Sequence, residues 1–239
     1  MRPGPEAGAG LERLARRFAL PDGAPGQLGR LLNLVASDTL APTAVRDPAA
    51  ALDVHVADAL VGLEMEVVRG AGRIADLGSG AGFPGLVLAA ALPQAEVALV
   101  ESSSRKCAFL ERAVAAMGLQ NVEVVCERAE AWRAGLARQD VVTARALASL
   151  NVLVEYAAPL LRDGGALVAW KGRRDAREEA DGAAAAEQTG LTAVEIRPVE
   201  PWVGTECLNL HVYVKVGSTP NTFPRRPGMA RKRPLQSST

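Results

Sequence analysis

The sequence predicts an α/β fold: a seven-stranded, mostly parallel sheet with helices on both faces. From residue 71 onward, short apolar runs alternate with helical stretches, so that the strand signal followed by the helix signal recurs five times. Two further apolar runs follow near the end of the chain. Parallel neighbours need crossover connections, which helices provide on both faces of the sheet. The chain has 239 residues, 49% of them hydrophobic, which is enough to bury such a core.

Residues 1–70 are predicted to form a small helical region that precedes the sheet. Apolar residues recur at helical spacing at Leu11, Leu14, Ala15 and Phe18, and again at Leu28, Leu31, Leu32 and Val35. A third helical stretch is expected to begin at Asp47, a typical N-cap residue, with Pro48 at the first helical position. Because each stretch is amphipathic, we expect the three to pack against the unit that follows.

Residues 71–216 are predicted to form the α/β domain. The expected strands are residues 73–76, 96–101, 122–126, 141–144, 166–170, 193–199 and 208–216. The expected helices are residues 85–92, 105–117, 129–136, 150–161 and 173–186. We expect the last two strands to be joined by a long connection.

Residues 217–239 form a basic tail. It carries five basic residues and no acid, so that the rest of the chain, whose overall formal charge is zero, is net acidic by five. Its low apolar content predicts that it cannot order itself alone, and we expect it to be flexible. A basic end on an acidic body indicates a polyanion partner. The cations that we expect to contact RNA are Arg225, Arg226, Arg231, Lys232 and Arg233, with Phe223 among them as a ring that can stack.

The strongest functional signal is the glycine-rich turn 76–85, which reads DLGSGAGFPG and follows the first strand of the sheet. Its glycines, Gly78 and Gly80 first, let a ligand approach the backbone closely. The spacing fails the dinucleotide fingerprint, because Phe83 stands where the third glycine would fall. Asp76, two residues before Gly78, would repel a pyrophosphate but suits a ligand with a positive amino group. The turn therefore favours S-adenosylmethionine over NAD, although a tight turn without a ligand is the alternative.

The ends of the next two strands supply further candidate contacts. Glu101 closes the second strand, where an acid can accept hydrogen bonds from both ribose hydroxyls. After the third strand, Ala129 and Glu130 can flank an adenine and accept from its amine. A solvated glutamate or a helix cap is the alternative for Glu101. The joint occurrence of the three strand ends predicts a nucleoside site.

Arg145, at the end of the fourth strand, is expected beside the transferable methyl group. The sequence there has neither the Pro-Pro-aromatic motif of adenine amino methylases nor a cysteine nucleophile of cytosine methylases. An acceptor with a free lone pair, such as guanine N7, needs neither, since positioning supplies most of its catalysis. Arginine can also donate two hydrogen bonds to guanine or phosphate.

Lys171, at the end of the fifth strand, is expected to point at the same cleft, which makes Arg145 and Lys171 the candidate catalytic pair. The alternatives are an ion pair of Arg145 with Asp140 or Glu155, and an ordinary exposed lysine. His55 and Asp58 lie three residues apart on one helical face, either over the pocket or as a surface pair.

Metal, disulfide, membrane and secretion signals are not found in the sequence. The cysteines, Cys107, Cys126 and Cys207, and the two histidines show no metal-ligand spacing, so that we expect no metal and no disulfide. No apolar run approaches the length that crosses a bilayer, and the first residues carry no secretion signal. We therefore expect a cytoplasmic protein, and a monomer.

Several motifs together resemble the RsmG (GidB) family of bacterial small-subunit ribosomal RNA guanine-N7 methyltransferases. The resemblance covers roughly residues 33–235 and rests on VRD at 45–47, His55 with Asp58, DLGSGAGFPG at 76–85, RALASL at 145–150, WKG at 170–172 and PRRPGMARKRP at 224–234. It implies a Rossmann-like class I methyltransferase that uses S-adenosyl-L-methionine to methylate one guanosine in the 530 loop of 16S rRNA, in free RNA or in the small ribosomal subunit. The cofactor-binding positions it implies are Gly78, Phe83, Ala129, Glu130 and Arg145.

Two other functions remain open at this level. One is a non-catalytic, cofactor-sensing module that binds the ribosome. The other is a nicotinamide-dependent oxidoreductase, against which Asp76 and Phe83 argue.

Overall fold

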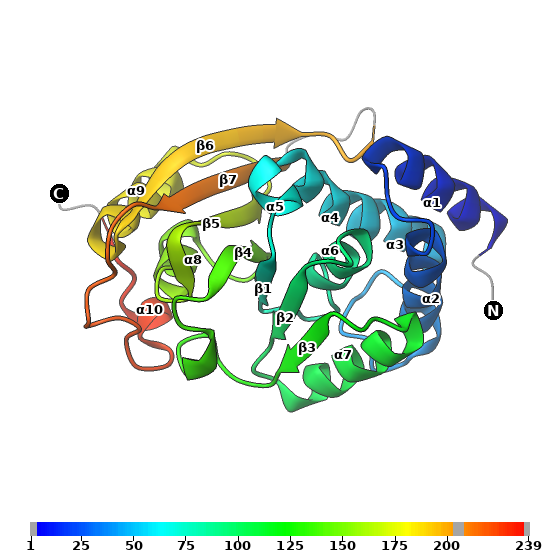
Figure 1. The fold of residues 1–239 in the computed structure, drawn as a ribbon, viewed down its shortest axis with the longest axis horizontal. Helices are drawn as coiled ribbons and strands as arrows, with labels where there is room; N and C mark the ends of the chain where they lie inside the picture. The colour runs from blue at the N-terminus through cyan, green and yellow to red at the C-terminus, as the bar shows by residue number, and fades with distance from the viewer. Residues whose placement is uncertain (1–3, 203–207, 237–239) are drawn as a thin grey trace.

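The computed structural model describes residues 4–202 and 208–236. Its centre is a seven-stranded sheet in the order β3-β2-β1-β4-β5-β7-β6 (Figure 1). The strands are β1 (Arg73–Leu77), β2 (Glu96–Val100), β3 (Val122–Val125), β4 (Gln139–Arg145), β5 (Leu161–Lys171), β6 (Leu191–Val199) and β7 (Leu208–Lys215). The first five pair in parallel, and β7 runs antiparallel to both of its neighbours. The predicted seven-stranded, mostly parallel sheet is confirmed.

The alternation of side chains along each strand divides the core into two layers. On β5, Ala166, Val168 and Trp170 join one apolar cluster, while Leu167 and Ala169 join the other. Successive side chains of a strand point to opposite faces, so a strand that is buried on both sides must be apolar throughout. The doubly covered sheet therefore follows from the continuous apolar runs of the sequence.

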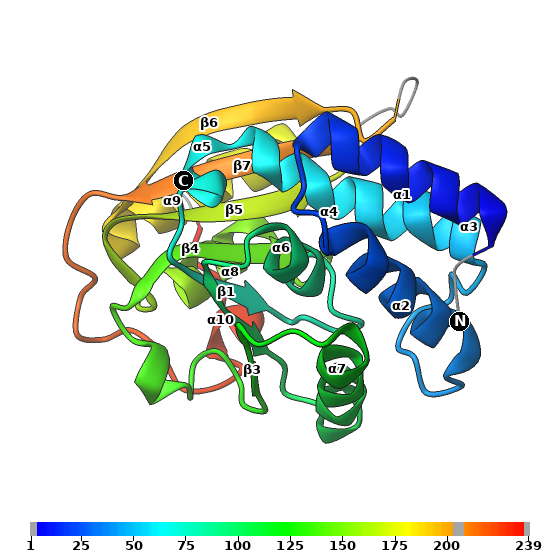
Figure 2. The same ribbon diagram turned by 45° about the vertical axis from the view of Figure 1, so that its right-hand side comes forward.

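Helices α6 (Gly85–Ala91) and α7 (Ser104–Met117) cover one face together with the N-terminal helices α1 (Pro5–Phe18) and α2 (Ala24–Ser37). Helices α8 (Leu150–Ala157) and α9 (Ala176–Thr189) cover the other face. The two groups lie on opposite sides of the sheet (Figures 1 and 2). The N-terminal region thus shares one apolar cluster with the helices of the α/β domain.

The third N-terminal stretch begins as predicted. The Asp47 side chain accepts a hydrogen bond of 2.9 Å from the backbone N–H of Ala50, and Pro48 occupies the first turn. The stretch then continues irregularly as α3 (Pro48–Ala51), η1 (Leu52–Ala57), α4 (Asp58–Leu60), η2 (Val61–Glu64) and α5 (Glu66–Arg69), in which η1 is a π-helix and η2 a 3-10 helix. A π-helical turn inside a helix is rare and is frequently found at functional sites.

The helix predicted at residues 129–136 is wrong. The connection from β3 to β4 contains a turn and η3, a 3-10 helix of three residues (Arg133–Gly135). Gly135 packs so closely against the Trp132 ring that an added Cβ would lie 2.3 Å from it. Most of the stability of a short helix comes from an apolar face that packs against the rest of the protein. This connection is too short to present such a face, so the 3-10 turn is not extended into an α-helix.

The C-terminal segment, residues 217–236, lies against the face of the sheet that α8 and α9 cover (Figure 1). It contains α10 (Met229–Lys232), whose Ala230 is 1% exposed within the second apolar cluster. Residues 217–236 are thus held in place by contacts with the surface on which they lie, unlike the flexible tail that the sequence predicts.

We predict that Gly62→Ala destabilises the fold. Its Cβ would lie 2.6 Å from the ring of the buried Trp170, and a rigid ring at that distance cannot yield. The free energy of unfolding should fall by about 1–3 kcal/mol, which urea denaturation measures. The matched control is Gly8→Ala in α1, where the new methyl group meets open space and should add up to about 1 kcal/mol through helix propensity. Equal effects of the two variants would contradict the close packing at Gly62.

Candidate functional site

The candidate site lies at the carboxyl ends of β1, β2 and β3, beside the point where the strand order reverses. The connection from β1 leads to β2 on one side, while β4 adds on the other side of β1. Ligands of open α/β sheets bind at such a switch point. A cavity of about 550 Å³ opens there, a size typical of small-molecule sites. Its lining includes the predicted residues Gly78, Glu101, Ala129 and Glu130.

The glycine-rich turn borders this cavity through Leu77 and Gly78, and its backbone adopts conformations that favour glycine. Gly78, Gly80 and Gly82 have φ angles of +67°, +56° and +92°. The N–H of Gly78 donates a 2.8 Å hydrogen bond to the carbonyl of Val100, which fixes the turn to β2. A Cβ on Gly78 would lie 2.5 Å from the Leu147 side chain. A side chain at this position would be strained by its φ angle and would have to displace the Leu147 side chain.

Asp76 lies beneath the turn and does not line the cavity. Its carboxylate accepts hydrogen bonds from the Thr143 hydroxyl at 3.0 Å and from the backbone N–H of Gly85 at 3.2 Å. Burial raises the pKa of Asp76 to about 6, against the opposing effect of these hydrogen bonds. The side chain joins β1, β4 and the start of α6. Asp76 is 1% exposed, and its contact with a ligand, which the sequence predicts, stays a prediction.

Glu101 lies between the glycine-rich turn and the cavity, as predicted. One carboxylate oxygen accepts from the N–H of Gly80 at 3.1 Å, and the other accepts from the N–H of Ser103 at 2.9 Å. The side chain is 5% exposed, and the Lys106 ammonium lies 3.8 Å away. Two backbone donors hold the carboxylate in one orientation at the wall of the cavity.

Glu130 is held in place by Gly228, a contact that the sequence did not predict. Its Oε1 accepts a 2.8 Å hydrogen bond from the backbone N–H of Gly228 in the C-terminal segment. Ala129 and Glu130 both line the cavity, together with Tyr156 from α8 and Arg231 from α10. Sequence reasoning missed Tyr156 as a site residue, since its only signal is membership of an apolar helix.

Arg145 is the centre of a second cluster, in which its hydrogen-bond and ion-pair partners come from the N-terminal region. One guanidinium nitrogen pairs with Asp58 and also donates to the Val54 carbonyl at 3.0 Å. The other guanidinium nitrogen lies 3.1 Å from Nδ1 of His55. The ion-pair partner of Arg145 is therefore Asp58. The alternative considered from the sequence, an ion pair with Asp140 or Glu155, is wrong.

Phe83 completes the cluster. The His55 ring stacks on the Phe83 ring with centroids 4.6 Å apart, and the Arg145 guanidinium lies 5.6 Å from the same ring. Phe83 and Arg145 are not among the residues that line the 550 Å³ cavity. Arg145 nevertheless directly precedes Ala146 and Leu147, which do line it.

The protonation state of His55 follows from its surroundings. Burial, followed by the positive charge of Arg145, lowers the pKa of His55 to about 4, so the ring is neutral at pH 7. Because a guanidinium can only donate, Nδ1 accepts from Arg145, and Nε2 carries the proton. Nε2 therefore donates to the Thr43 hydroxyl oxygen, 3.0 Å away. Burial also raises the pKa of Asp58, against the effect of Arg145.

Lys171 lies outside the cavity. Its ammonium forms a 2.6 Å ion pair with Glu178 of α9 and lies 3.4 Å from the carbonyl of Ala148. The Glu178 carboxylate also accepts from the N–H of Leu150. Lys171 and Glu178 together hold the segment that follows Arg145.

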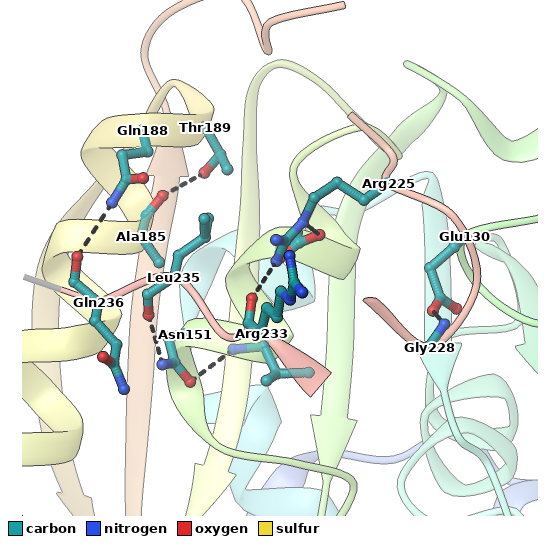
Figure 3. A network of polar contacts seen from close by, with 12 residues as sticks. Glu130, Asn151, Ala185, Gln188, Thr189, Arg225, Gly228, Arg233, Leu235 and Gln236 are labelled. Atoms are coloured by element: carbon teal, nitrogen blue, oxygen red, sulfur yellow. Dashed lines mark hydrogen bonds and ion pairs between the residues drawn. The ribbon is translucent and has the colours of Figure 1, made fainter. Parts of the chain in front are cut away.

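The five cations predicted to contact RNA divide into two groups. Arg225 forms an ion pair with Glu155, and Arg231 donates a 2.8 Å hydrogen bond to the carbonyl of Leu147 (the Arg225 contact is drawn in Figure 3). The cations whose side chains point to solvent and make no hydrogen bond or ion pair within the described part of the chain are Arg226, Lys232 and Arg233.

The expectation of no disulfide is wrong. Cys107, in the first turn of α7, and Cys126, directly after β3, form a disulfide with Cα atoms 5.8 Å apart. The packing of α7 beside β3 brings the two residues together, and their separation of 19 positions carries no pairing signal. Cys207 lies outside the described residues.

Residues 4–202 and 208–236 contain neither a cluster that could bind a metal ion nor a helix that could span a membrane. Within these ranges, no group of three His, Cys, Asp or Glu side chains is arranged to hold a metal ion. None of the helices there has the length and the apolar content that a bilayer requires.

The family model and the relatives that match this chain carry the same family description. A family model described as rRNA small subunit methyltransferase G matches residues 30–200. A protein named Ribosomal RNA small subunit methyltransferase G from Rubrobacter xylanophilus is 43% identical, over 80% of this chain and 76% of the relative. A protein of the same name from Chloroflexus aggregans is 40% identical, over 84% of this chain and 85% of the relative.

A solved structure supports the fold. A SAM dependent methyltransferase from Aquifex aeolicus aligns with a TM-score of 0.53 and 16% identity, over 69% of this chain and 93% of that chain. At this identity, the likeness establishes the shared fold.

We predict that His55 makes stability depend on pH. Its pKa of about 4 in the folded protein lies below its value of about 6.5 in the unfolded chain. The unfolded chain therefore binds the extra proton first, and stability is lost as pH falls from about 6.5 toward 4. Between pH 7 and pH 4.5, wild type should lose up to about 2 kcal/mol more than His55→Asn, which has no titrating ring. Urea denaturation at both pH values measures this difference, and parallel losses would contradict the neutral, buried imidazole.

Proposed function

The chain belongs to the ribosomal RNA small subunit methyltransferase G family, and from that premise we propose that it transfers a methyl group from S-adenosyl-L-methionine to N7 of a guanosine in the 530 loop of 16S rRNA. The structural observation that carries the proposal is the 550 Å³ cavity at the carboxyl ends of β1–β3. Its lining combines the glycine-rich turn with Glu101, Ala129 and Glu130, the residue types that a nucleoside without phosphates requires.

The charges around the cavity fit a sulfonium nucleoside better than a diphosphate. Three acids line it, and three basic residues balance them: Glu101, Glu127 and Glu130, with Lys106, Arg128 and Arg231. The carboxylate of Glu101 lies within 3.1 Å of the backbone N–H of Gly80, where a dinucleotide would place its pyrophosphate. A phosphate at that position would meet a carboxylate, whereas ribose hydroxyls can donate to it. We propose that Glu101 holds the ribose, and that Ala129 and Glu130 hold the adenine.

The acceptor side is proposed to be the cluster around Arg145. S-adenosyl-L-methionine supplies a methyl group on a positive sulfur, which the lone pair of guanine N7 can accept without prior loss of a proton. The protein therefore needs no general base, and His55, whose pKa is lowered to about 4, is a weak one. Asp58 and His55 hold Arg145 at the carboxyl end of β4, where its guanidinium can orient a guanine or an RNA phosphate. We propose that Lys171 supports the segment that follows Arg145, since its ammonium pairs with Glu178.

RNA binding is proposed for the solvent-facing cations of the C-terminal segment, Arg226, Lys232 and Arg233. Exposed cations displace counterions from phosphates, so their contribution should weaken as salt rises. Arg225 and Arg231 were part of the same expectation. The ion pair with Glu155 offsets the charge of Arg225, whereas the hydrogen bond of Arg231 to the neutral carbonyl of Leu147 leaves its charge in place.

We predict that the purified protein methylates 16S rRNA, or small subunits, from cells that lack the modification. The measurement is incorporation of label from S-adenosyl-L-methionine, followed by borohydride and aniline treatment, which cleaves the strand at 7-methylguanosine. Cleavage within the 530 loop is the expected result. RNA from cells that carry the modification serves as the control and should accept no label. Ribosome binding without transfer would indicate a non-catalytic binding module, and label on another atom would refute N7 specificity.

We predict that Gly78→Ala weakens the binding of S-adenosyl-L-methionine at least about tenfold, or about 1.4 kcal/mol. The added methyl group would lie 2.5 Å from the Leu147 side chain and push it aside, which changes the shape of the cavity that both residues line. The matched control is Gly118→Ala at the end of α7, where φ is +70° and the new Cβ meets open space. Both variants carry the same backbone strain, but only Gly78→Ala should change the dissociation constant measured by calorimetry. Equal dissociation constants for the two variants would contradict our placement of the cofactor.

A further inference from the structure

The C-terminal segment reaches the rim of the cavity and contacts it at two points. The backbone N–H of Gly228 donates to Oε1 of Glu130 at 2.8 Å (Figure 3). Three residues further on, Arg231 donates to the carbonyl of Leu147 at 2.8 Å and lines the cavity itself. Glu130 follows β3 and Leu147 follows β4, so the segment spans the opening between two strand ends.

The segment is anchored on α8 by polar contacts that involve buried groups. The guanidinium of Arg225 pairs through two nitrogens with the carboxylate of Glu155, which is 2% exposed. The same guanidinium donates to the carbonyl of Arg233 at 2.9 Å, and the Asn151 amide donates to the carbonyl of Leu235 at 2.6 Å (Figure 3). Removal of the segment would leave the Glu155 carboxylate buried without its partner, which is costly. These contacts fix where the turn around Gly228 lies.

Leu147 connects Arg231 with the glycine-rich turn. Its side chain packs over Gly78, where an added Cβ would lie only 2.5 Å from it. The hydrogen bond from Arg231 therefore acts on a residue that lines the cavity. Glu130, Gly228, Arg231, Leu147 and Gly78 form a continuous series of contacts around the cavity.

The contact with Gly228 also determines what Glu130 can do. Its Oε1 is occupied by the N–H of Gly228, while Oε2 accepts no hydrogen bond from the described residues. The side chain is 8% exposed and lines the cavity. One carboxylate oxygen is thus held in place, and the other can accept from a ligand such as an amine of adenine.

We propose that residues 224–235 form the outer wall of the cofactor pocket, and that Arg231 is a positioning residue for the nucleoside end of S-adenosyl-L-methionine. This inference rests on the proposed function, since it concerns the same pocket. Arg231 acts through Leu147 and the turn at Gly228, and it touches none of the reacting atoms. Both Arg231 and Lys232 are exposed, but of these two only Arg231 lines the cavity.

The test compares two neighbouring cations of α10 by calorimetry with S-adenosyl-L-methionine alone, and by steady-state kinetics with rRNA. Arg231→Ala should raise the dissociation constant and the KM for S-adenosyl-L-methionine about tenfold, with little change in kcat and no larger change in the KM for RNA than Lys232→Ala causes. The matched control, Lys232→Ala, removes the same charge one residue away. It should leave the dissociation constant of S-adenosyl-L-methionine unchanged and raise the KM for RNA. Arg231→Lys, which keeps a donor for the Leu147 carbonyl, should recover part of the affinity.

A second variant separates positioning from charge. Gly228→Ala removes no cation, and its new methyl group meets open space, but it strains a residue whose φ is +84°. It should weaken binding of S-adenosyl-L-methionine without any change in the salt dependence of RNA binding. Equal dissociation constants for wild type, Arg231→Ala and Gly228→Ala would overturn the inference and leave the proposed function intact. No binding of S-adenosyl-L-methionine by wild type would overturn the proposed function, and the inference with it.

Discussion

The buried carboxylate of Asp76 is the constraint on which the site depends. It joins Thr143 of β4 to the first residue of α6, directly beneath the glycine-rich turn. Burial of a carboxylate is costly unless hydrogen bonds compensate it, so the two donors must keep their positions. Gly85 is part of the same constraint, because a Cβ there would lie 2.8 Å from the Asp76 carboxylate. The turn is thereby held at the switch point of the sheet before any ligand arrives.

The two ends of the chain complete the site from opposite sides of the sheet. The N-terminal helices supply His55 and Asp58, which orient Arg145, while the C-terminal segment supplies Gly228 and Arg231. The α/β core thus provides the strand ends and the glycine-rich turn, and the extensions provide the side chains that fix their surroundings. A widely shared fold can therefore hold a specific site, because the residues that determine function lie in the loops and extensions added to the common core.

Several elements could be predicted from the sequence because their signals are local. The continuous apolar runs predict strands buried on both faces, and Asp47 with Pro48 predicts the start of α3. The helix predicted at residues 129–136 is wrong because helical spacing over one short segment says nothing about what the segment packs against. The disulfide was missed for a related reason, since the contact of Cys107 with Cys126 depends on how α7 lies beside β3.

By itself, the sequence determined the order of the seven strands, the glycine-rich turn and the strand ends that carry Glu101, Ala129 and Glu130. These features depend on neighbours within a few residues, whose periodicity and backbone preferences are written in the chain. Only the tertiary structure decided that Asp76 faces the protein, that His55 and Asp58 bind Arg145, and that Gly228 holds Glu130. His55 is 90 positions from Arg145, and Glu130 is 98 positions from Gly228. No local pattern encodes such pairs, because they meet only when packed elements bring distant parts of the chain together.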